Sequence, residues 1–298
     1  MKALAEAAER LGCVVRRKEP LNRHTTFKTG GCAELFIEVN TQSGLSELLK
    51  IINGSGFRFF LLGNGSNVLA PDGGYDGVIL KLCGEFENMH RVGEDALYCG
   101  AGALLVRFCT FARECCLSGM EFAYGIPGTL GGAVYMNAGA YGSEIKNVIS
   151  DCLYMDYSGE IHTASNEEMQ LGYRTSVFQK KPSVILGAKF KLIPDNGEEI
   201  RMRMDGFMQR RRDKQPLEFP SAGSTFKRPE GNFAGALIEQ CGLKGRSVGG
   251  AQVSEKHAGF IINRQNAASA DIKELISLVQ AEVLEKTGYE LKKEVIYL

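Results

Sequence analysis

The sequence predicts an α+β fold made of two parts that meet near residue 195. Strand-length and helix-length apolar patterns alternate along the first part, beginning with a strand at 34–39, a helix at 45–52 and a strand at 57–62. Pro194-Asp195-Asn196-Gly197 is the clearest linker signal in the chain. With 298 residues, 44% of them hydrophobic, both parts can build cores. We therefore divide the chain into domains at 1–195 and 196–298, and the first domain into subdomains at about 1–75 and 76–195.

The first part is expected to begin with an amphipathic helix at 1–11, because Leu4, Ala8 and Leu11 share one face. Strands at 78–81 and 96–99 then precede an apolar helix at 104–116. A hairpin joins 148–156 to 160–163 through the turn Ser158-Gly159, and the last strand of this part covers 184–192.

The second part is expected to open with a charged helix at 198–213, followed by an irregular stretch at 214–231. Further apolar patterns indicate a helix at 234–241, a strand at 259–262, a helix at 271–286 that Gly288 ends, and a terminal strand at 294–297.

Composition excludes several classes of function. The 35 basic and 35 acidic side chains cancel, so no net field attracts the chain to nucleic acid or to an anionic membrane. No apolar run has the length of a membrane span, and no signal peptide is recognised. The nine cysteines lie mostly in apolar segments and predict reduced thiols in a cytoplasmic protein. The four histidines are far apart and no Cys-x-x-Cys pair occurs, so no metal site is expected.

Two glycine-rich turns indicate a diphosphate site. The segment 125–142 contains six glycines, and 62–68 is a second turn after an apolar strand. Such turns expose backbone amides that bind phosphate, and a helix beginning near Gly131 would add its positive end. The alternative is structural: Asn64-Gly65 is also a typical hairpin turn, and the later glycines would then only pack a helix on a strand.

The two common nucleotide-binding motifs are absent. Gly63-Asn64-Gly65 is followed by Val68 where the third glycine of Gly-x-Gly-x-x-Gly would stand, and no Gly-x-x-x-x-Gly-Lys-Ser/Thr segment occurs. The sequence therefore argues against a Rossmann domain and a P-loop, and leaves a two-turn cradle of another fold.

Further motifs accompany the two turns over nearly the whole chain: Thr25-Thr26-Phe27-Lys28-Thr29-Gly30-Gly31, Tyr173-Arg174-x-Ser176, Gly223-Ser224-x-Phe226-Lys227 and Glu294-Val295. Together they resemble the UDP-N-acetylenolpyruvoylglucosamine reductase family. The resemblance implies a two-subdomain FAD-binding domain of the vanillyl-alcohol-oxidase type and a C-terminal α+β substrate-binding domain. It also implies reduction of an enolpyruvyl ether to the lactyl ether of UDP-N-acetylmuramate, for peptidoglycan synthesis, by hydride transfer from NADPH through non-covalent FAD.

The resemblance implies three catalytic residues, and their chemistry is consistent with the reaction. Adding hydride to the β carbon places negative charge on the carboxylate, which the guanidinium of Arg174 can bind with two hydrogen bonds. The resulting enediolate needs a proton at its α carbon, for which Ser224 is the implied donor. Glu294 is implied to orient or polarise the enolpyruvyl group. Ser221, three residues earlier, is the hydroxyl that could be mistaken for the donor. By default a serine at that position is a turn residue.

The remaining site residues follow from the turns and the resemblance. The FAD-binding set is Gly63, Asn64, Gly65, Ser66, Asn67, Gly125, Ile126, Pro127, Gly128, Thr129, Gly132 and Ala133. The implied contacts to the nucleotide-sugar substrate are Tyr141, Tyr173, Lys214, Lys227 and His257. For His257 a hydrogen-bonded structural histidine is the alternative.

The chain departs from the family pattern in three places. Ile296 stands where relatives often have arginine, and Arg228 replaces an asparagine of some relatives. The spacing from Tyr173 to Val184 leaves no room for the extra substrate loop of longer members, which places the chain in the shorter subclass. A flavin oxidase of the same cofactor fold and a non-catalytic nucleotide-sugar binding protein are the competing interpretations.

Overall fold

A computed structural model describes residues 1–298, which form two compact units. Unit 1 comprises 1–17, 35–64 and 77–210, and unit 2 comprises 18–34, 65–76 and 211–298. Each unit has its own apolar core, and that of unit 2 includes Phe27 and Leu69 from the N-terminal third of the chain. The units are thus assembled from separated segments and differ from the linear division near residue 195. The assignment of cofactor and substrate domains to 1–195 and 196–298 stays a prediction.

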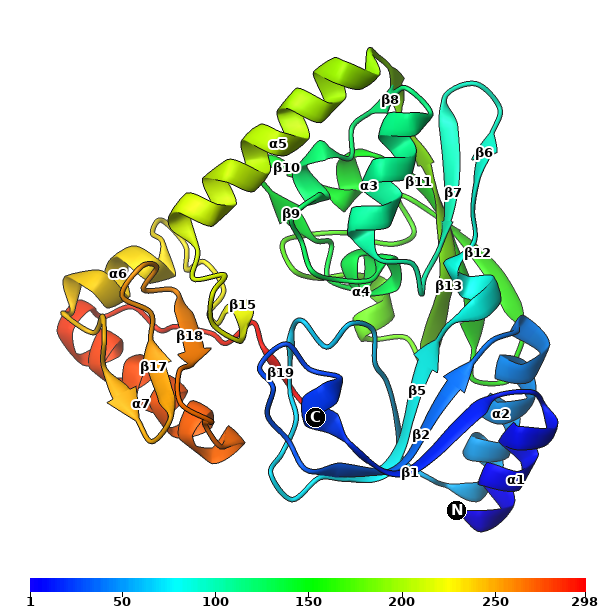
Figure 1. Ribbon diagram of the computed structural model, residues 1–298, viewed down its shortest axis with the longest axis horizontal. Coiled ribbons are helices and arrows are strands. Elements are labelled where there is room, and N and C mark those ends of the chain that lie inside the picture. The colour runs from blue at the N-terminus through cyan, green and yellow to red at the C-terminus, as the bar shows by residue number, and fades with distance from the viewer. The chain divides into compact units, whose positions relative to one another are not determined.

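The first layer of unit 1 combines two helices with a sheet in the order β1-β2-β5-β3. Helices α1 (Lys2–Arg10) and α2 (Gln42–Ser55) contact each other beside this sheet (Figure 1). The strands are β1 (Val14–Pro20), β2 (Cys32–Val39), β3 (Phe59–Leu61) and β5 (Tyr75–Leu82), and β3 runs parallel to β5. Helix α2 buries Leu45, Leu48 and Ile52 along one stripe. Thr41 caps its start, and Gly56 ends it in the left-handed conformation. The predicted β-α-β order is confirmed.

The second layer of unit 1 is a five-stranded antiparallel sheet in the order β12-β11-β13-β7-β6. Its strands are β6 (Met89–Val92), β7 (Ala96–Gly100), β11 (Ile149–Asp156), β12 (Ile161–Ser165) and β13 (Ser183–Lys191). Helix α4 (Leu130–Tyr135) contacts β7 and β13, and α3 (Leu105–Glu114) contacts the short strand β8 (Leu117–Ser118). Strand β8 pairs with β14 (Ile193–Pro194), and β9 (Gly139–Ala140) with β10 (Ser143–Glu144). The predicted hairpin through Ser158-Gly159 is confirmed.

Unit 2 contains a four-stranded antiparallel sheet in the order β15-β18-β17-β16. Its strands are β15 (Ser221–Ser224), β16 (Ser247–Val248), β17 (Ala251–Val253) and β18 (Phe260–Asn263), and its helices are α6 (Ala234–Gln240) and α7 (Ser269–Thr287). Helix α7 buries Ile272, Leu275 and Val279 and ends at Gly288 as predicted. A separate parallel pair joins β4 (Val68–Leu69) to β19 (Ile296–Tyr297). The predicted terminal strand therefore covers two residues and begins after Glu294.

The predicted charged helix is α5 (Gly197–Lys214), and five short 3₁₀ helices complete the secondary structure. These are η1 (Leu21–Arg23), η2 (Gly84–Glu87), η3 (Glu121–Ala123), η4 (Ile145–Asn147) and η5 (Val177–Gln179). All nine cysteines are free thiols, as predicted. No helix is both long and apolar enough to cross a membrane.

An ion pair in unit 1 fixes α5 to the segment before the second glycine turn. Arg203 donates to the buried carboxylate of Glu121 through Nε (3.1 Å) and Nη2 (2.9 Å). Burial acts to raise the pKa of Glu121, but hydrogen bonds from the backbone, Ser118 and Arg203 outweigh it and lower the pKa. The carboxylate is therefore charged in the folded state. It stabilises the folded state at pH values above the ordinary glutamate pKa.

We expect Glu121→Gln to lower the free energy of unfolding by about 1–3 kcal/mol at neutral pH, the typical cost of removing a charged partner from a buried hydrogen-bond group. Because the folded-state pKa lies below the unfolded one, the wild-type advantage should be complete above the unfolded pKa and disappear as pH falls through the folded value. Urea denaturation at several pH values measures this. The exposed neighbour Glu114→Gln is the control, and an equal loss in both variants contradicts the assignment.

Candidate active site

Gly63 and Asn64 of the first glycine turn contact the second glycine turn within unit 1. The side-chain Nδ2 of Asn64 donates to the carbonyl of Pro127 at 2.6 Å. A Cβ added to Gly63 would stand 2.5 Å from Oγ1 of Thr129, closer than any real contact. The sequence alone did not place the turns together. Their contact favours one shared ligand over two unrelated hairpin turns.

The first turn offers a continuous set of backbone donors. None of the N–H groups from Gly63 to Asn67 donates a hydrogen bond. Gly65 is buried, with φ +60, and a Cβ there would lie 2.0 Å from the carbonyl oxygen of His24. Because peptide N–H groups in folded proteins nearly always find acceptors, a run of free donors at a side-chain-free turn fits an anionic ligand.

The second turn offers fewer donors than the sequence predicts. Ile126 N–H donates to the carbonyl of Ala123 at 2.9 Å, and Pro127 has no N–H. The N–H groups of Gly132 and Ala133 bond to Oγ1 and the carbonyl of the helix cap Thr129. The donors that remain are those of Gly125, Gly128 and Thr129. Gly128 does not have a positive φ, so backbone conformation does not require a glycine there.

Arg174 stands in a strained turn of unit 1. Gly172 and Thr175 exchange two backbone hydrogen bonds of 3.1 Å, and Arg174 between them has φ +53, which is uncommon for a residue with a side chain. Its Nη2 donates to the carbonyl of Gly139 at 3.3 Å, and the guanidinium lies 5.2 Å from the ring centre of Tyr173. The side chain is therefore held by local contacts that set its direction.

Two buried polar side chains connect the Arg174 turn to helix α4 and to the segment that directly follows this helix. Asn137, which is fully buried, donates to the carbonyl of Gly172 at 2.9 Å. The hydroxyl of Ser176 donates to the carbonyl of Tyr135, the last residue of α4, at 2.7 Å. Helix α4 has six residues and starts at the second glycine turn, so it spans about 9 Å between that turn and the anchor of Arg174. Asn137 was not predicted as a site residue, and its isolated position in the sequence gives no signal of this role.

Tyr141, a predicted substrate contact, occupies the turn between β9 and β10. Tyr141 (φ +55) and Gly142 (φ +85) form a two-residue hairpin loop of the type that needs positive φ at both positions. The hydroxyl donates to the carbonyl of Phe207 at 3.1 Å, and the two rings stack at 4.6 Å. Its single proton is thus used within unit 1. Tyr173, the other predicted tyrosine, is 47% exposed.

Ser224 ends the edge strand β15 of unit 2. Ser221 pairs with Ile262 and Ser224 with Phe260, so one extra residue forms a bulge between the serines, where Gly223 has φ +74. Because Ile262 and Phe260 are two residues apart, the bulge places both serines on the same face of the sheet. Ser224 is exposed and Ser221 is half-buried.

Glu294 lies next to the Ser224 strand because two segments of unit 2 pair. The N–H of Glu294 donates to the carbonyl of Thr225, and the N–H of Lys227 donates to the carbonyl of Lys292, both at 2.8 Å. Thr225 is fully buried and directly follows Ser224. Unit 2 by itself therefore brings the predicted proton donor and the predicted orienting acid into neighbouring positions.

Known proteins are similar to this chain over nearly its whole length. A family model for the C-terminal domain of UDP-N-acetylenolpyruvoylglucosamine reductase matches residues 215–298, and an FAD binding domain model matches residues 33–165. UDP-N-acetylenolpyruvoylglucosamine reductase of Agathobacter rectalis is 44% identical, over 99% of this chain and 96% of the relative. That of Clostridioides difficile is 43% identical, over 94% and 92%. The chain belongs to the UDP-N-acetylenolpyruvoylglucosamine reductase family.

Solved structures agree with this assignment to the reductase family. The crystal structure of UDP-N-acetylenolpyruvylglucosamine reductase from Thermus caldophilus matches with a TM-score of 0.81 and 32% identity, over 96% of this chain and 98% of that chain. A berberine bridge enzyme variant matches with a TM-score of 0.50 and 14% identity, over 65% of this chain and 44% of that one, and so shows a shared fold alone. The family predicted from sequence and the predicted fold class are confirmed.

The other residues that the reductase resemblance implied lie in unit 2. Lys214 is exposed at the end of α5, and Lys227 is half-buried. The Nδ1 atom of His257 accepts a hydrogen bond from the N–H of Gly259 at 3.1 Å, and the ring packs edge-on against Phe260. Burial lowers the pKa of His257, so its ring is neutral near pH 7. These contacts favour the structural alternative for His257.

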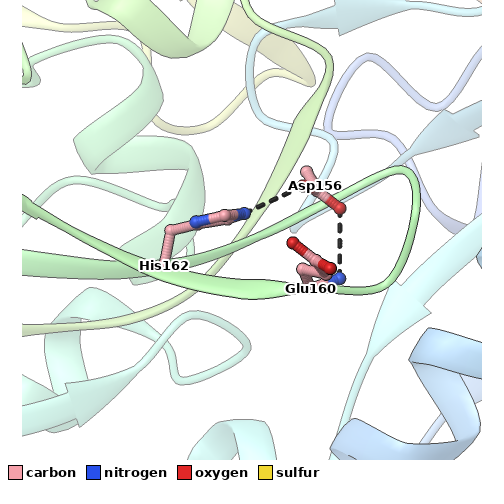
Figure 2. A group of neighbouring side chains, drawn as sticks. All are labelled: Asp156, Glu160 and His162. Atoms are coloured by element: carbon pink, nitrogen blue, oxygen red, sulfur yellow. Dashed lines mark hydrogen bonds and ion pairs between the residues drawn. The ribbon is translucent and has the colours of Figure 1, made fainter.

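One group of metal-type side chains occurs in the reductase chain, at the β11–β12 hairpin. Asp156, Glu160 and His162 offer ligand atoms within 4.8 Å of one another (Figure 2). Asp156 Oδ1 accepts hydrogen bonds from Ser158 and from the N–H of Glu160, and Oδ2 lies 2.8 Å from His162 Nε2. The Ser158 hydroxyl and His162 hold the pKa of Asp156 well below its usual range. We therefore assign this group to the turn of the hairpin.

Proposed function

We propose that this chain is an NADPH-dependent flavoenzyme that reduces the enolpyruvyl ether of UDP-N-acetylglucosamine to UDP-N-acetylmuramate. This reaction supplies a peptidoglycan precursor. The observation that carries the proposal is the contact between the two glycine turns in a chain that shares over 40% identity with named reductases along nearly its whole length. Nine free thiols support a location in the cytoplasm.

The residues of the two turns fit the diphosphate of FAD. A Cβ at Gly63 would collide with Thr129, a Cβ at Gly65 would collide with the carbonyl of His24, and the free N–H groups of each turn are donors for phosphate oxygens. When bound there, FAD would carry hydride from NADPH to the β carbon of the enolpyruvyl group. No histidine or cysteine of the chain is distinguished as a covalent anchor, so we expect the flavin to be non-covalent.

Arg174 is proposed to bind the carboxylate of the enolpyruvyl group. Negative charge builds on that carboxylate as the β carbon gains hydrogen. A pre-oriented guanidinium therefore stabilises the transition state more than it stabilises the ground state. The positive φ of Arg174 and the hydrogen bonds from Asn137 and Ser176 support the proposal that this turn orients the guanidinium. Arg174 thus has the fixed geometry that such stabilisation requires.

Ser224 is proposed to give its proton to the α carbon, and Glu294 to orient the enolpyruvyl group. A hydroxyl is a weak acid, but the enediolate carbon is a strong base, so the transfer is favourable. Ser224 is exposed and directly precedes Thr225, whose carbonyl accepts the N–H of Glu294. Both observations support these roles. Lys227 follows in the same segment and can polarise the serine.

Anaerobic turnover tests the proposal. Protein mixed with NADPH and the enolpyruvyl substrate should form NADP⁺ and a product heavier by two hydrogen atoms in equal amounts. NADPH oxidation that requires oxygen and does not depend on the enolpyruvyl substrate would indicate a flavin oxidase instead. Protein that binds the sugar nucleotide without any turnover would indicate a binding protein.

Arg174→Lys keeps the positive charge but loses the planar fork. We expect oxidation of the reduced flavin by the enolpyruvyl substrate to slow roughly 10- to 100-fold, while reduction by NADPH stays within about twofold of wild type. Stopped-flow absorbance separates the two half-reactions. Arg91→Lys is the matched control, because Arg91 also donates to backbone carbonyls of unit 1 but lies in the β6–β7 hairpin. Unchanged turnover of Arg174→Lys would reduce Arg174 to a structural residue.

A further inference from the structure

Asn67 links the first glycine turn to the C-terminal segment of unit 2. Its side-chain Nδ2 donates to the carbonyl of Glu294 at 3.2 Å, across 227 positions of sequence. Its own carbonyl accepts the N–H of Ile296 at 2.9 Å. One residue of the predicted cofactor turn therefore holds the chain on both sides of Val295.

Glu294 is fixed from its other side by the Ser224 segment. Its N–H donates to the carbonyl of Thr225 at 2.8 Å, and Oγ1 of buried Thr225 accepts the N–H of Ile261 at 3.1 Å. Both peptide groups of Glu294 are thus committed, the N–H to the strand that ends at Ser224 and the carbonyl to Asn67. The two tethers together place the backbone of Glu294.

The C-terminal segment combines a short strand pair with the side chain of Val295, which is buried in the core of unit 2. Strand β19 pairs with β4 over only two residues, Ile296 with Val68 and Tyr297 with Leu69. A pair this short is marginal by itself. The side-chain bond of Asn67 to the carbonyl of Glu294 adds to this short pair, at the position where the segment carries Glu294.

The backbone of Asn67 also belongs to the turn whose N–H groups are free for an anion. Its N–H, like those of Gly65 and Ser66, donates no hydrogen bond in the protein. A diphosphate bound to these donors would restrict the backbone of the turn and hence the side chain of Asn67. By linkage, whatever orders the turn also orders the segment that the turn holds.

We propose that Asn67 is a positioning residue for Glu294, and that occupation of the Gly65–Asn67 turn by the diphosphate of FAD orders the C-terminal segment around Glu294. This inference rests on the proposed function for the identity of the ligand. It adds a coupling between cofactor binding and the carboxylate that we propose to orient the enolpyruvyl group.

Asn67→Asp is the sharpest test, because it preserves size but replaces the donor by an oxygen that repels the Glu294 carbonyl. Asn64→Asp is the matched control: it places the same charge in the same turn and also removes a donor from a carbonyl, that of Pro127. Both variants are compared at saturating FAD. Asn67→Ala, which adds no charge, is the second variant if the aspartate does not fold.

Hydrogen exchange of the amides of Glu294, Ile296 and Leu298 is the direct readout and needs no activity. In wild type, FAD should slow their exchange at least tenfold relative to the FAD-free protein. Asn67→Asp and Asn67→Ala should abolish most of this difference, whereas Asn64→Asp with FAD bound should keep it. Equal protection in all variants, or equal loss in Asn64→Asp and Asn67→Asp, would overturn the proposal.

The half-reactions give the second readout. Asn67→Asp loaded with FAD should slow oxidation of the flavin by the enolpyruvyl substrate roughly 5- to 50-fold, the scale of a misplaced orienting group, with NADPH reduction nearly unchanged. Equal slowing of both halves would mean a general structural defect and would contradict the positioning role. If wild-type reduced flavin fails to react with the enolpyruvyl substrate, the proposed function is wrong, while the exchange experiment still decides the coupling.

Discussion

Ser224→Ala should slow oxidation of the reduced flavin by the enolpyruvyl substrate roughly 10²- to 10⁴-fold, the range for loss of a positioned general acid. Flavin content and reduction by NADPH should stay near wild type, because the residue lies at the exposed end of an edge strand and fills no core position. Stopped-flow absorbance of the flavin measures both half-reactions in one preparation.

Ser221→Ala is the demanding control for this prediction. The bulge at Gly223 places both serines on the same face of the sheet, so face alone does not separate them. Only Ser224 adjoins Thr225, whose carbonyl accepts the N–H of Glu294. We therefore expect less than a threefold effect at Ser221, within the usual range for a surface substitution. A larger effect at Ser221 than at Ser224 would show that Ser221, and not Ser224, is the proton donor.

Gly65→Val should yield protein without flavin. The substitution meets two obstacles: a φ of +60, which a branched side chain strongly disfavours, and a Cβ 2.0 Å from the carbonyl of His24. The turn must move, and its run of free N–H groups moves with it. The ratio of flavin to protein absorbance after purification measures the loss.

Gly93→Val separates the two obstacles, because Gly93 has φ +71 but open space around the added Cβ. This control should keep its flavin. Full flavin occupancy in Gly65→Val would show that the first turn is not the cradle, and acid-precipitated wild-type protein that retained its colour would show that the flavin is covalent.

The sequence was sufficient for most elements and for the family. Helix α2 and the strands on either side follow directly from apolar periodicity and the caps Thr41 and Gly56, which are local signals. The Ser158-Gly159 hairpin follows from turn chemistry for the same reason. The motifs from 25–31 to 294–295 were specific because they occurred together and in order.

The arrangement of the site could not be predicted, because it depends on contacts between distant residues. Nothing in the sequence indicates that Phe27 and Leu69 join the core of the C-terminal unit. The sequence indicated Asn67 only as a cofactor-binding residue, whereas its side-chain Nδ2 donates to the carbonyl of Glu294. The left-handed backbone of Arg174 depends on Asn137 and Ser176, whose hydrogen bonds span 35 and 41 positions.

A single turnover of pre-reduced protein tests whether the bound flavin itself reduces the enolpyruvyl group. The FAD-loaded protein is reduced by light without NADPH, in the absence of oxygen, and mixed with the enolpyruvyl substrate. We expect the oxidised flavin spectrum to return completely and one equivalent of UDP-N-acetylmuramate to form per flavin. Flavin that stays reduced until oxygen is admitted, with no lactyl product, would contradict it.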